Sequence, residues 1–426
     1  MQWRQLHTTT RRILAIPAMT LLFASAAWAA PNETVLHPFN GGVGGGQPNA
    51  ALIADSQGNL YGTTYAGGNT TNCTGGCGTV FELIPNGAGK WTEKLVHIFS
   101  GGIGGSNPSA ALIFDGLGNL YGTTVGGGAS GFGIVFELIP GANGTWSGKI
   151  LHSFTGTVGG GSLFGDLVFD SLGNLYGTAN SGGAYGFGTV FKLTPSAKGV
   201  WGEQVLHPFG SNKNDGARPN AGLIFDSLGN LYGTTSAGGS GGSGGNGTVF
   251  ELTLGTNGHW SEQIIYSFAG GSDGSNPLSD LIFDSLGNLY GTTYYGGTGS
   301  CASGTVTCGT VFQLTPGSNG VWTKAVLHQF KGGNDGGGPV AGLVFDTSGN
   351  LYGTTTGSGG TNAGSVFELI PGTNGWGEKV LHGFSVGSVG GAVPRCRLIL
   401  DSLGNLYGTA SAGGGGGAGL VFQITP

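Results

Sequence analysis

The chain has 426 residues, and only 8 % of them are charged, far below the roughly 25 % of ordinary soluble domains. Glycine accounts for 95 residues, yet 38 % of the chain is hydrophobic, so it can bury a core and is not a disordered low-complexity polymer. The formal net charge is −6 and no patch of Lys and Arg occurs, which excludes nucleic acid as an expected partner.

The first 29 residues have the pattern of a secretory signal peptide. Three arginines precede the apolar stretch 13–23, and Ala27-Trp28-Ala29 fits the small-x-small cleavage rule. A membrane anchor is the alternative, but the apolar run is shorter than the roughly 20 residues that a span needs. We therefore expect residues 1–29 to be removed. Residues 30–426 are then one secreted, periplasmic or cell-surface domain without a transmembrane anchor.

A repeat fills the rest of the chain. The string Gly-Asn-Leu-Tyr-Gly occurs seven times, and an aspartate lies four residues before each of its asparagines. A Val-Phe pair and a Leu-His-x-Phe motif, or a near variant, recur with the same period. Fixed-period similarity of this length is typical of repeat architectures. The seven aspartates are Asp55, Asp115, Asp170, Asp226, Asp284, Asp346 and Asp401.

Each repeat predicts four antiparallel strands, A to D. In one repeat, strand A is the apolar run 223–225, a Ser-Leu-Gly-Asn turn follows, strand B covers 231–235 and strand C covers 248–252. Strand D contains the Leu-His-x-Phe motif, as in 379–384. Four antiparallel strands joined by tight turns are typical of a propeller blade. The sequence therefore predicts an all-β, seven-bladed β-propeller.

The two ends of the repeat array complement each other. The last repeat stops after strand C, at 421–425, whereas residues 33–39 carry a Leu-His-x-Phe motif ahead of the first repeat. If the N-terminal segment supplies strand D of the last blade, the ring closes and two exposed sheet edges disappear. We therefore predict that the last blade is closed by the N-terminal strand.

Three segments of the repeat carry a resemblance to a known family. They are Phe-Asp-Ser-Leu-Gly-Asn-Leu-Tyr-Gly-Thr-Thr at 225–235, Gly-Thr-Val-Phe-Glu-Leu at 247–252 and Leu-His-Pro-Phe at 206–209. The repeat resembles the GloVer-type tandem repeat of exported bacterial proteins, over the whole mature chain. The resemblance implies a surface or secreted β-propeller-like protein, often with a separate C-terminal anchor, which we do not expect here. It implies no established reaction.

Residues repeated in every blade are expected to serve the scaffold, because copies spread round a ring cannot form one site. We interpret the seven aspartates as caps of their own turns, and the tryptophans as blade-packing residues. The strand-D histidines are interpreted as structural residues near the rim, with Tyr266 in place of a seventh, and we expect neither a metal nor a cofactor. These histidines are His37, His97, His152, His207, His328 and His382.

Function is expected where the repeats differ. Four residues before the strand-A aspartate, three blades carry Asp166, Asp280 and Arg397 where the others have Ala or Gly. Strand A is innermost in a propeller, so we expect these charges near the mouth of the central channel. The D–A loops add Asp215, Asp273 and Asp335, each in an Asp-Gly pair that is equally typical of a simple turn.

The B–C loops vary in length and combine aromatic side chains with Gly, Ser, Thr and Asn. Aromatic faces beside hydroxyl and amide groups suit sugars, and low-complexity surface drift is the alternative. The candidate ligand-binding tyrosines are Tyr65, Tyr185, Tyr294 and Tyr295.

The cysteines indicate an oxidising compartment. Cys73 and Cys77 share one B–C loop, and Cys301 and Cys308 share another, so we predict two local disulfides. A four-cysteine zinc site is disfavoured because the two loops belong to blades that are not neighbours. Cys396 is left over, either free or in an intermolecular bond.

Two classes of function remain. The first is a monomeric binding or scaffold module for glycans or another extracellular ligand, such as a protein. The alternative is a polysaccharide-active hydrolase or lyase at the channel mouth, with Asp166 and Asp280 as the acid/base pair. The sequence contains no phosphate loop, cofactor fingerprint or Ser-His-Asp order. The sequence favours the binding module, with its ligand over the channel on the face of the B–C and D–A loops.

Overall fold

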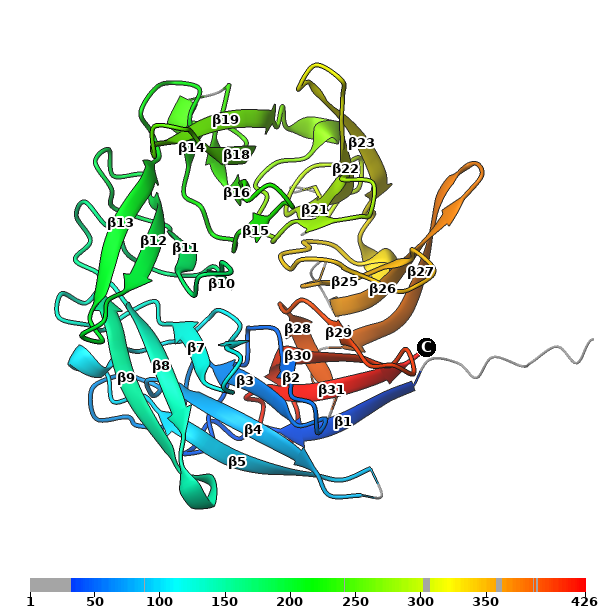
Figure 1. The fold of residues 1–426 in the computed structure, drawn as a ribbon. Helices are drawn as coiled ribbons and strands as arrows, with labels where there is room; N and C mark the ends of the chain where they lie inside the picture. Colours follow the sequence, from blue (N-terminus) through cyan, green and yellow to red (C-terminus); the bar gives the residue numbers. More distant parts are fainter. Residues whose placement is uncertain are drawn as a thin grey trace, which may run out of the picture. The chain divides into compact units, whose positions relative to one another are not determined.

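The computed structural model describes residues 32–87, 89–240, 242–301, 307–357, 362–385, 387 and 390–426. The predicted signal peptide, 1–29, lies outside the described residues. From Asn32 onward, the described residues form seven blades around a central channel, as Figure 1 shows, and each blade contains a four-stranded antiparallel path. The predicted all-β, seven-bladed propeller is confirmed. None of the described helices is both long and apolar enough to cross a membrane.

The strands of the first three blades follow the predicted order A to D. Blade 1 is β2 (Ile53–Ala54), β3 (Leu60–Thr64), β4 (Thr79–Pro85) and β5 (Trp91–Ile98). Blade 2 is β6 (Ile113–Phe114), β7 (Leu120–Thr123), β8 (Ile134–Pro140) and β9 (Trp146–Ser153). Blade 3 is β10 (Val168–Phe169), β11 (Leu175–Ala179), β12 (Thr189–Pro195) and β13 (Trp201–Pro208).

The next three blades repeat this order. Blade 4 is β15 (Ile224–Phe225), β16 (Leu231–Thr235), β18 (Thr248–Leu254) and β19 (Trp260–Ser267), with the extra pair β14 (Gly216–Ala217) and β17 (Ala237–Gly238) beside it. Blade 5 is β20 (Ile282–Phe283), β21 (Leu289–Thr293), β22 (Thr310–Pro316) and β23 (Trp322–Gln329). Blade 6 is β24 (Val344–Phe345), β25 (Leu351–Thr355), β26 (Asn362–Gly372) and β27 (Gly375–Ser385).

Blade 7 joins the two ends of the described chain. It consists of β29 (Ile399–Leu400), β30 (Leu406–Gly413), β31 (Leu420–Thr425) and β1 (Asn32–Pro38), with β28 (Gly391–Pro394) also paired to β30. Short 3-10 turns occur at Gly102–Gly104, Ala142–Gly144, Gly242–Gly244, Gly271–Asp273 and Gly333–Asp335.

The N-terminal strand closes the ring as predicted. β1 pairs antiparallel with β31, with Val35 opposite Phe422, and Figure 1 shows the two strands side by side. A register shift between Val35 and His37 repeats the one that the outer strand pair shows in the other blades. Trp91 of blade 1 then packs on Tyr407 of blade 7, at 6.5 Å between ring centroids. The closing strand therefore has the same geometry as the six outer strands that it complements.

The core lies between the blades. In six of the seven pairs of neighbours, the strand-D tryptophan packs on the strand-B tyrosine of the preceding blade, as Trp146 does on Tyr61 at 6.3 Å. The exception is the pair of blades 6 and 7, because β1 has no tryptophan. The glycine of Leu-Tyr-Gly leaves room for the strand-C phenylalanine, because a Cβ on Gly233 would lie 2.6 Å from Phe250 Cζ. The tryptophans are thus blade-packing residues, as the sequence predicted.

The aspartates of the A–B turns cap those turns. In blade 4, Asp226 Oδ1 accepts hydrogen bonds from the backbone N–H groups of Leu228 at 2.8 Å and Asn230 at 2.9 Å. The other oxygen accepts from Asn230 Nδ2 at 2.8 Å and lies 3.3 Å from the Tyr232 hydroxyl. The other blades repeat these contacts, which confirms the turn interpretation.

Both predicted disulfides are present, Cys73–Cys77 and Cys301–Cys308. Cys396 is a free thiol that is 1 % exposed, and its Sγ lies 3.0 Å from the backbone N of Thr409. Burial of this thiol excludes an intermolecular disulfide in the folded ring, so of the two alternatives the free thiol is correct.

Candidate functional site

Asp166, Asp280 and Arg397 meet in the central channel, and we call these three residues the channel layer. Each lies two residues ahead of an innermost strand, β10, β20 and β29 respectively. All three border a cavity of about 90 Å³ at the D–A loop end and a second cavity of about 350 Å³ further along the channel. The first cavity has polar walls that include Asn49, Ser109 and Asn220. The second is lined mainly by apolar strand-A side chains such as those of Leu112, Val168 and Ile224.

Each aspartate of the channel layer is fixed by the preceding blade. Asp166 Oδ1 accepts a hydrogen bond from the backbone N–H of Ala111 at 2.7 Å, and Asp280 Oδ1 accepts one from Gly222 at 2.6 Å. Arg397 reaches across from blade 7, and its Nη2 lies 3.6 Å from Asp166 Oδ2. The layer therefore joins charges from three blades that are far apart in the sequence.

The electrostatics of the layer make Asp166 easier to protonate than an ordinary aspartate. Burial and the neighbouring Asp280 carboxylate raise the pKa of Asp166 to about 6, although Arg397 and the Ala111 N–H oppose them. The buried Nε of Arg397 has no hydrogen-bond partner within the described part of the chain. An unpaired guanidinium N–H beside carboxylates can bind a ligand that both donates and accepts hydrogen bonds.

The candidate tyrosines lie elsewhere. Tyr65, Tyr185, Tyr294 and Tyr295 border neither channel cavity. The rings of Tyr294 and Tyr295 contact each other at 4.5 Å between centroids, and Tyr185 is 51 % exposed. The structure brings the three charges together but does not bring the tyrosines into the same cavity, so their role in binding stays a prediction.

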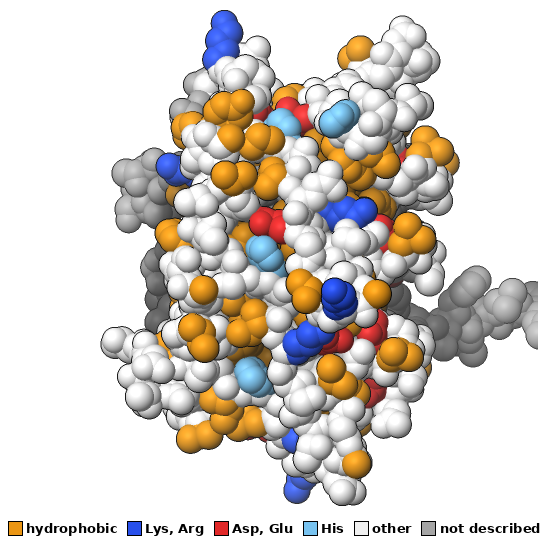
Figure 2. Space-filling view, turned by 60° about the vertical axis from the view of Figure 1, so that its left-hand side comes forward, with side chains coloured by type: hydrophobic (Ala, Val, Ile, Leu, Met, Phe, Trp, Pro, Cys, Tyr) orange, Lys and Arg blue, Asp and Glu red, His pale blue; other side chains and the backbone are white. Residues whose placement is uncertain are grey.

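The strand-D histidines lie at the boundaries between neighbouring outer strands, which we call seams. Where the next blade has a glutamate two positions after its tryptophan, that glutamate is the partner. Examples are His37 with Glu93 at 3.5 Å and His152 with Glu203 at 3.2 Å. Figure 2 shows histidine side chains spaced along one side of the molecule, some with acidic side chains beside them, on a surface that is otherwise mostly uncharged. The histidines are rim residues, as expected, but their carboxylate partners were missed.

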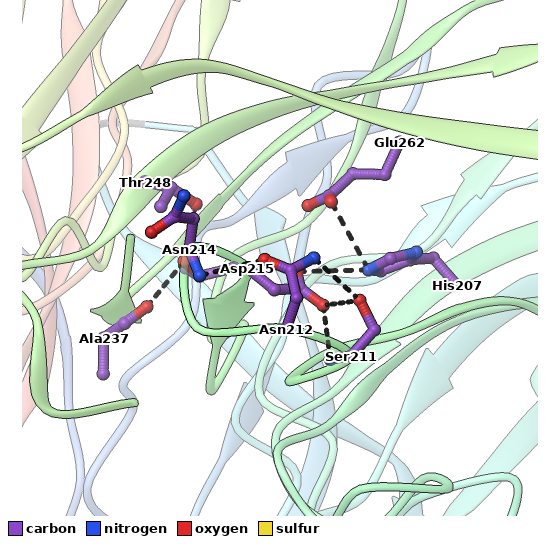
Figure 3. Close-up of polar contacts among 9 residues, drawn as sticks. His207, Ser211, Asn212, Asn214, Asp215, Ala237, Thr248 and Glu262 are labelled. Atoms are coloured by element: carbon purple, nitrogen blue, oxygen red, sulfur yellow. Dashed lines mark hydrogen bonds and ion pairs between the residues drawn. The ribbon is translucent and has the colours of Figure 1, made fainter. Parts of the chain in front are cut away.

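Two of the seams that contain a histidine also contain a third residue, an aspartate. Between blades 3 and 4, His207 Nε2 lies 3.3 Å from Asp215 Oδ1 and 3.7 Å from Glu262 Oε2, as Figure 3 shows. Burial raises the pKa of Glu262 to about 7, opposed by His207 and reinforced by Asp215. Between blades 5 and 6, His328, Asp335 and Glu378 form the same group. Asp215 and Asp335 therefore have tertiary partners, beyond the turn role open to them from the sequence.

Solved structures that are similar to this chain differ widely from it in sequence. One is a protein of unknown function from Dyadobacter fermentans, 11 % identical with a TM-score of 0.44, covering 82 % of this chain and 97 % of that one. A luciferin-regenerating enzyme is 14 % identical with a TM-score of 0.42, covering 93 % and 95 %. An ancestral GH74 enzyme is 11 % identical with a TM-score of 0.53, covering 92 % of this chain but 48 % of that one. At 11 % identity, the likeness to the GH74 enzyme shows the fold alone.

The family is shown by the sequence itself. Among curated protein sequences, none matches this chain. The profile of the Gloeobacter/Verrucomicrobia repeat matches three overlapping stretches, 23–161, 134–307 and 299–426, and so extends over nearly all seven blades. The GloVer-type resemblance of the repeat motifs is thereby confirmed, and the chain belongs to the Gloeobacter/Verrucomicrobia repeat family.

Proposed function

We propose that the protein is an exported binding module whose channel mouth takes a neutral, hydroxyl-rich ligand such as the end of a glycan. The observation that carries the proposal is the channel layer, which forms the floor of a polar cavity. Asp166 and Asp280 offer acceptor oxygens, and the buried Arg397 Nε offers an unused donor. A sugar hydroxyl both donates and accepts, so one such ligand can use both kinds of group.

The charge balance of the layer argues against an ionic ligand. The layer has two carboxylates and one guanidinium, so it would repel an anionic ligand. A cationic ligand would bind at Asp166, but Arg397 already lies against that carboxylate. The cavity of about 90 Å³ has room for several water molecules, and their release on binding would offset the ordering of a small polar group. The size favours a terminal sugar unit over an internal stretch of polysaccharide.

Catalysis by a polysaccharide hydrolase or lyase is the second candidate, and it rests on Asp166. A carboxyl group with a pKa of about 6 can act as a general acid near neutral pH. The binding role is preferred because both aspartates have an oxygen committed to a backbone N–H of another blade, which fixes them as part of the wall.

Export is supported by the two disulfides, which are typical of oxidising compartments such as the periplasm or the cell exterior. Sequencing of the mature N-terminus after expression with the native leader tests this part. We expect cleavage after Ala29, and an uncleaved cytoplasmic protein would contradict it.

The binding proposal is tested with a glycan array, followed by calorimetry on the best hit. Asp280→Asn and Arg397→Gln should each weaken binding at least 10-fold, since each removes a group that faces the cavity. Glu203→Gln, which changes a charged side chain at a seam, is the matched control and should bind as the wild type does. A reducing-sugar assay on the same glycans separates the two candidates. Release that Asp166→Asn abolishes would establish the enzyme. Binding that survives both channel variants would place the site elsewhere.

A further inference from the structure

Three consecutive seams differ from the other four at one position of the D–A loop. In the seams between blades 3 and 4, 4 and 5, and 5 and 6, this position is Asp215, Asp273 and Asp335. In the remaining seams it is a glycine, namely Gly44, Gly104, Gly159 and Gly390. The change matters because the loop lies against the histidine–glutamate pair. At the seam of blades 2 and 3, a Cβ on Gly159 would lie 2.3 Å from Glu203 Oε1, so there the glutamate fills the space.

Each of the three aspartates is oriented by its own loop. One oxygen, Oδ2, accepts the backbone N–H of the residue four positions earlier: Ser211 at 2.7 Å, Ala269 at 2.7 Å and Lys331 at 2.6 Å. This bond leaves the other oxygen, Oδ1, directed at the side chains of the seam. Ligands held in this way by outer hydrogen bonds are characteristic of metal sites.

At the seam of blades 3 and 4 the donors converge. His207 Nε2 lies 3.3 Å from Asp215 Oδ1 and 3.7 Å from Glu262 Oε2, and all three donor atoms lie within 4.8 Å of one another (Figure 3). Donors around a tetrahedral zinc ion are about 3.4 Å apart, from metal–ligand distances near 2.1 Å. The Asp215 side chain is fully buried and that of Glu262 is 10 % exposed, yet the buried Oε1 of Glu262 has no hydrogen-bond partner within the described residues.

The seam of blades 5 and 6 repeats the group independently. His328 Nε2 lies 2.9 Å from Asp335 Oδ1, and Glu378 completes a set of donors within 4.8 Å of one another. The buried Oε1 of Glu378 likewise has no partner in the described part of the chain. The rings of both histidines pack edge-on against a phenylalanine two residues later, which fixes their direction.

The seam of blades 4 and 5 contains a positively charged side chain at the equivalent place. There Tyr266 and Lys324 replace the histidine and the glutamate together, and Asp273 is retained. The Lys324 side chain is 4 % exposed, and its Nζ lies 2.8 Å from Asp273 Oδ1, with a further bond to the Asp273 carbonyl. The Tyr266 hydroxyl donates to the same Asp273 oxygen at 2.7 Å. At this seam the protein supplies its own buried cation to the aspartate.

We propose that the seams of blades 3 and 4 and of blades 5 and 6 each bind one divalent first-row transition-metal ion, with His207, Asp215 and Glu262, and His328, Asp335 and Glu378, as ligands. One imidazole and two carboxylates are a ligand set for zinc and its neighbours, whereas calcium and magnesium prefer oxygen alone. The sites are additional to the sequence analysis, which expected no metal. They lie on the rim and do not depend on the channel layer.

A cavity of about 490 Å³ lies beside the first site and is lined by Asp215, Asn212, Lys213 and Phe187 among others. His207 and Glu262 do not line it, and the Asp215 side chain is fully buried, so the cavity reaches the edge of the site and not its donor atoms.

The stoichiometry of Zn²⁺ on untagged, chelator-treated protein tests the proposal. Metal content after desalting and calorimetric titration should both give two Zn²⁺ per chain. Asp215→Asn and Asp335→Asn should each leave one, and the double variant none, with unchanged far-UV circular dichroism. Glu203→Gln, at a seam with a histidine and a glutamate but no aspartate, is the matched control and should keep two.

A variant that gains a metal site distinguishes the loss of a ligand from the loss of the fold, because a misfolded protein would not bind an additional ion. The double variant Tyr266→His, Lys324→Glu rebuilds the ligand set around Asp273 and should raise the stoichiometry from two to three. Co²⁺ loaded in place of Zn²⁺ should give visible absorption bands whose intensity follows the same series. Wild-type protein that binds no Zn²⁺, zinc content independent of Asp215 and Asp335, or binding of Ca²⁺ in preference to Zn²⁺ would each overturn the proposal.

Discussion

The seven A–B turns and the seven seams are built by the same repeat, but only the turns are the same in every blade. Each turn aspartate bonds to atoms within its own blade, so its geometry is complete in a single copy. Each seam joins residues of two copies. At the seam of blades 4 and 5 both partners differ from the pattern, Tyr266 for His and Lys324 for Glu, although they lie far apart in the sequence. The contacts of the turns are therefore uniform, whereas the contacts of the seams differ from one pair of blades to the next.

Deletion of β1 should have the largest effect, because this one strand contributes to two seams, through Glu33 and through His37. Removing residues 32–39 also leaves the outer edge of β31 unpaired and takes Phe39 out of the core. We expect loss of cooperative unfolding for the whole ring, since burial of Phe39 alone is worth about 3–5 kcal/mol. Thermal unfolding followed by near-UV circular dichroism measures it. Moving the segment to follow Pro426 through a linker is the control and should restore the transition. A deletion that melts only one blade would contradict the prediction.

Replacement of a turn aspartate should lower the free energy of unfolding by less than the deletion of β1 does, and by the same amount in every blade. Asp226→Ala removes the acceptor for two backbone N–H groups and the Asn230 side chain, a loss of about 2–3 kcal/mol. Urea unfolding of Asp226→Ala and of the equivalent Asp284→Ala should give the same destabilisation within about 0.5 kcal/mol. Widely different values would break the distinction between uniform turns and variable seams.

The turn and channel aspartates should respond oppositely to pH. The pKa of Asp166 is raised to about 6, so its native form binds the proton more tightly and stability is lost as pH rises from about 4 through 6. Between pH 4 and pH 7, the free energy of unfolding of Asp166→Asn should therefore rise by about 1–2 kcal/mol relative to that of the wild type. In Asp115, burial opposes the hydrogen bonds from Asn119 and Leu117, which lower its pKa.

Asp115→Asn is the matched control for that experiment. In the wild type, the lowered pKa of Asp115 contributes to the free energy of unfolding above about pH 4, and this contribution is lost as pH falls further. Asp115→Asn lacks the contribution, so its deficit against the wild type should be largest at neutral pH and should shrink below about pH 4. Urea titrations at pH 4 and pH 7 measure the slope for Asp166→Asn, and titrations at pH 4 and about pH 2.5 measure the slope for Asp115→Asn. Slopes of the same sign would contradict the electrostatic assignment of the channel layer.

The smallest effect is expected at the seam of blades 1 and 2, where Gly148 stands in place of the glutamate. Burial lowers the pKa of His97, and a Cβ on Gly148 would lie 3.4 Å from His97 Cε1. Gly148→Glu should raise that pKa, observable by NMR titration, while stability rises by less than about 1 kcal/mol, only at acidic pH. Gly148→Gln provides the same side-chain length without charge and should leave the pKa low. An unchanged pKa of His97 in Gly148→Glu would mean that a glutamate at this position does not reach the histidine as it does at the other seams.

The blades, their closure and the disulfides were predictable because they depend on local spacing. Seven copies of one turn, and a Leu-His-x-Phe motif displaced to the N-terminus, are visible in the sequence alone. The meeting of Asp166, Asp280 and Arg397 was also accessible, since a fixed offset from the turn aspartate places a residue at a fixed depth in the channel.

The seam groups were not found from the sequence, because each joins strand D of one blade, a loop, and strand D of the next. Single positions such as Asp215 look like turn residues when only their Asp-Gly neighbours are read. A signal did exist in the residue two positions after the repeat tryptophan. It is glutamate in four blades and glycine in blade 2, and it changes to lysine in blade 5, the blade that follows Tyr266. Alignment of each histidine with the next repeat, and not its own, would have shown the pairing.

The pairing of β1 with β31 also sets the order of events when the chain is made. β1 is synthesised early, but its partner comes from 420–425, so its hydrogen-bonding edge and the apolar side chains of Leu36 and Phe39 wait for nearly the whole chain. At roughly 5–20 residues per second, that delay is on the order of 20 to 80 s. Throughout it, the first strand is an unoccupied template for any other strand. The ring can therefore form without aggregation only if β1 is kept from pairing with other strands until β31 has been synthesised.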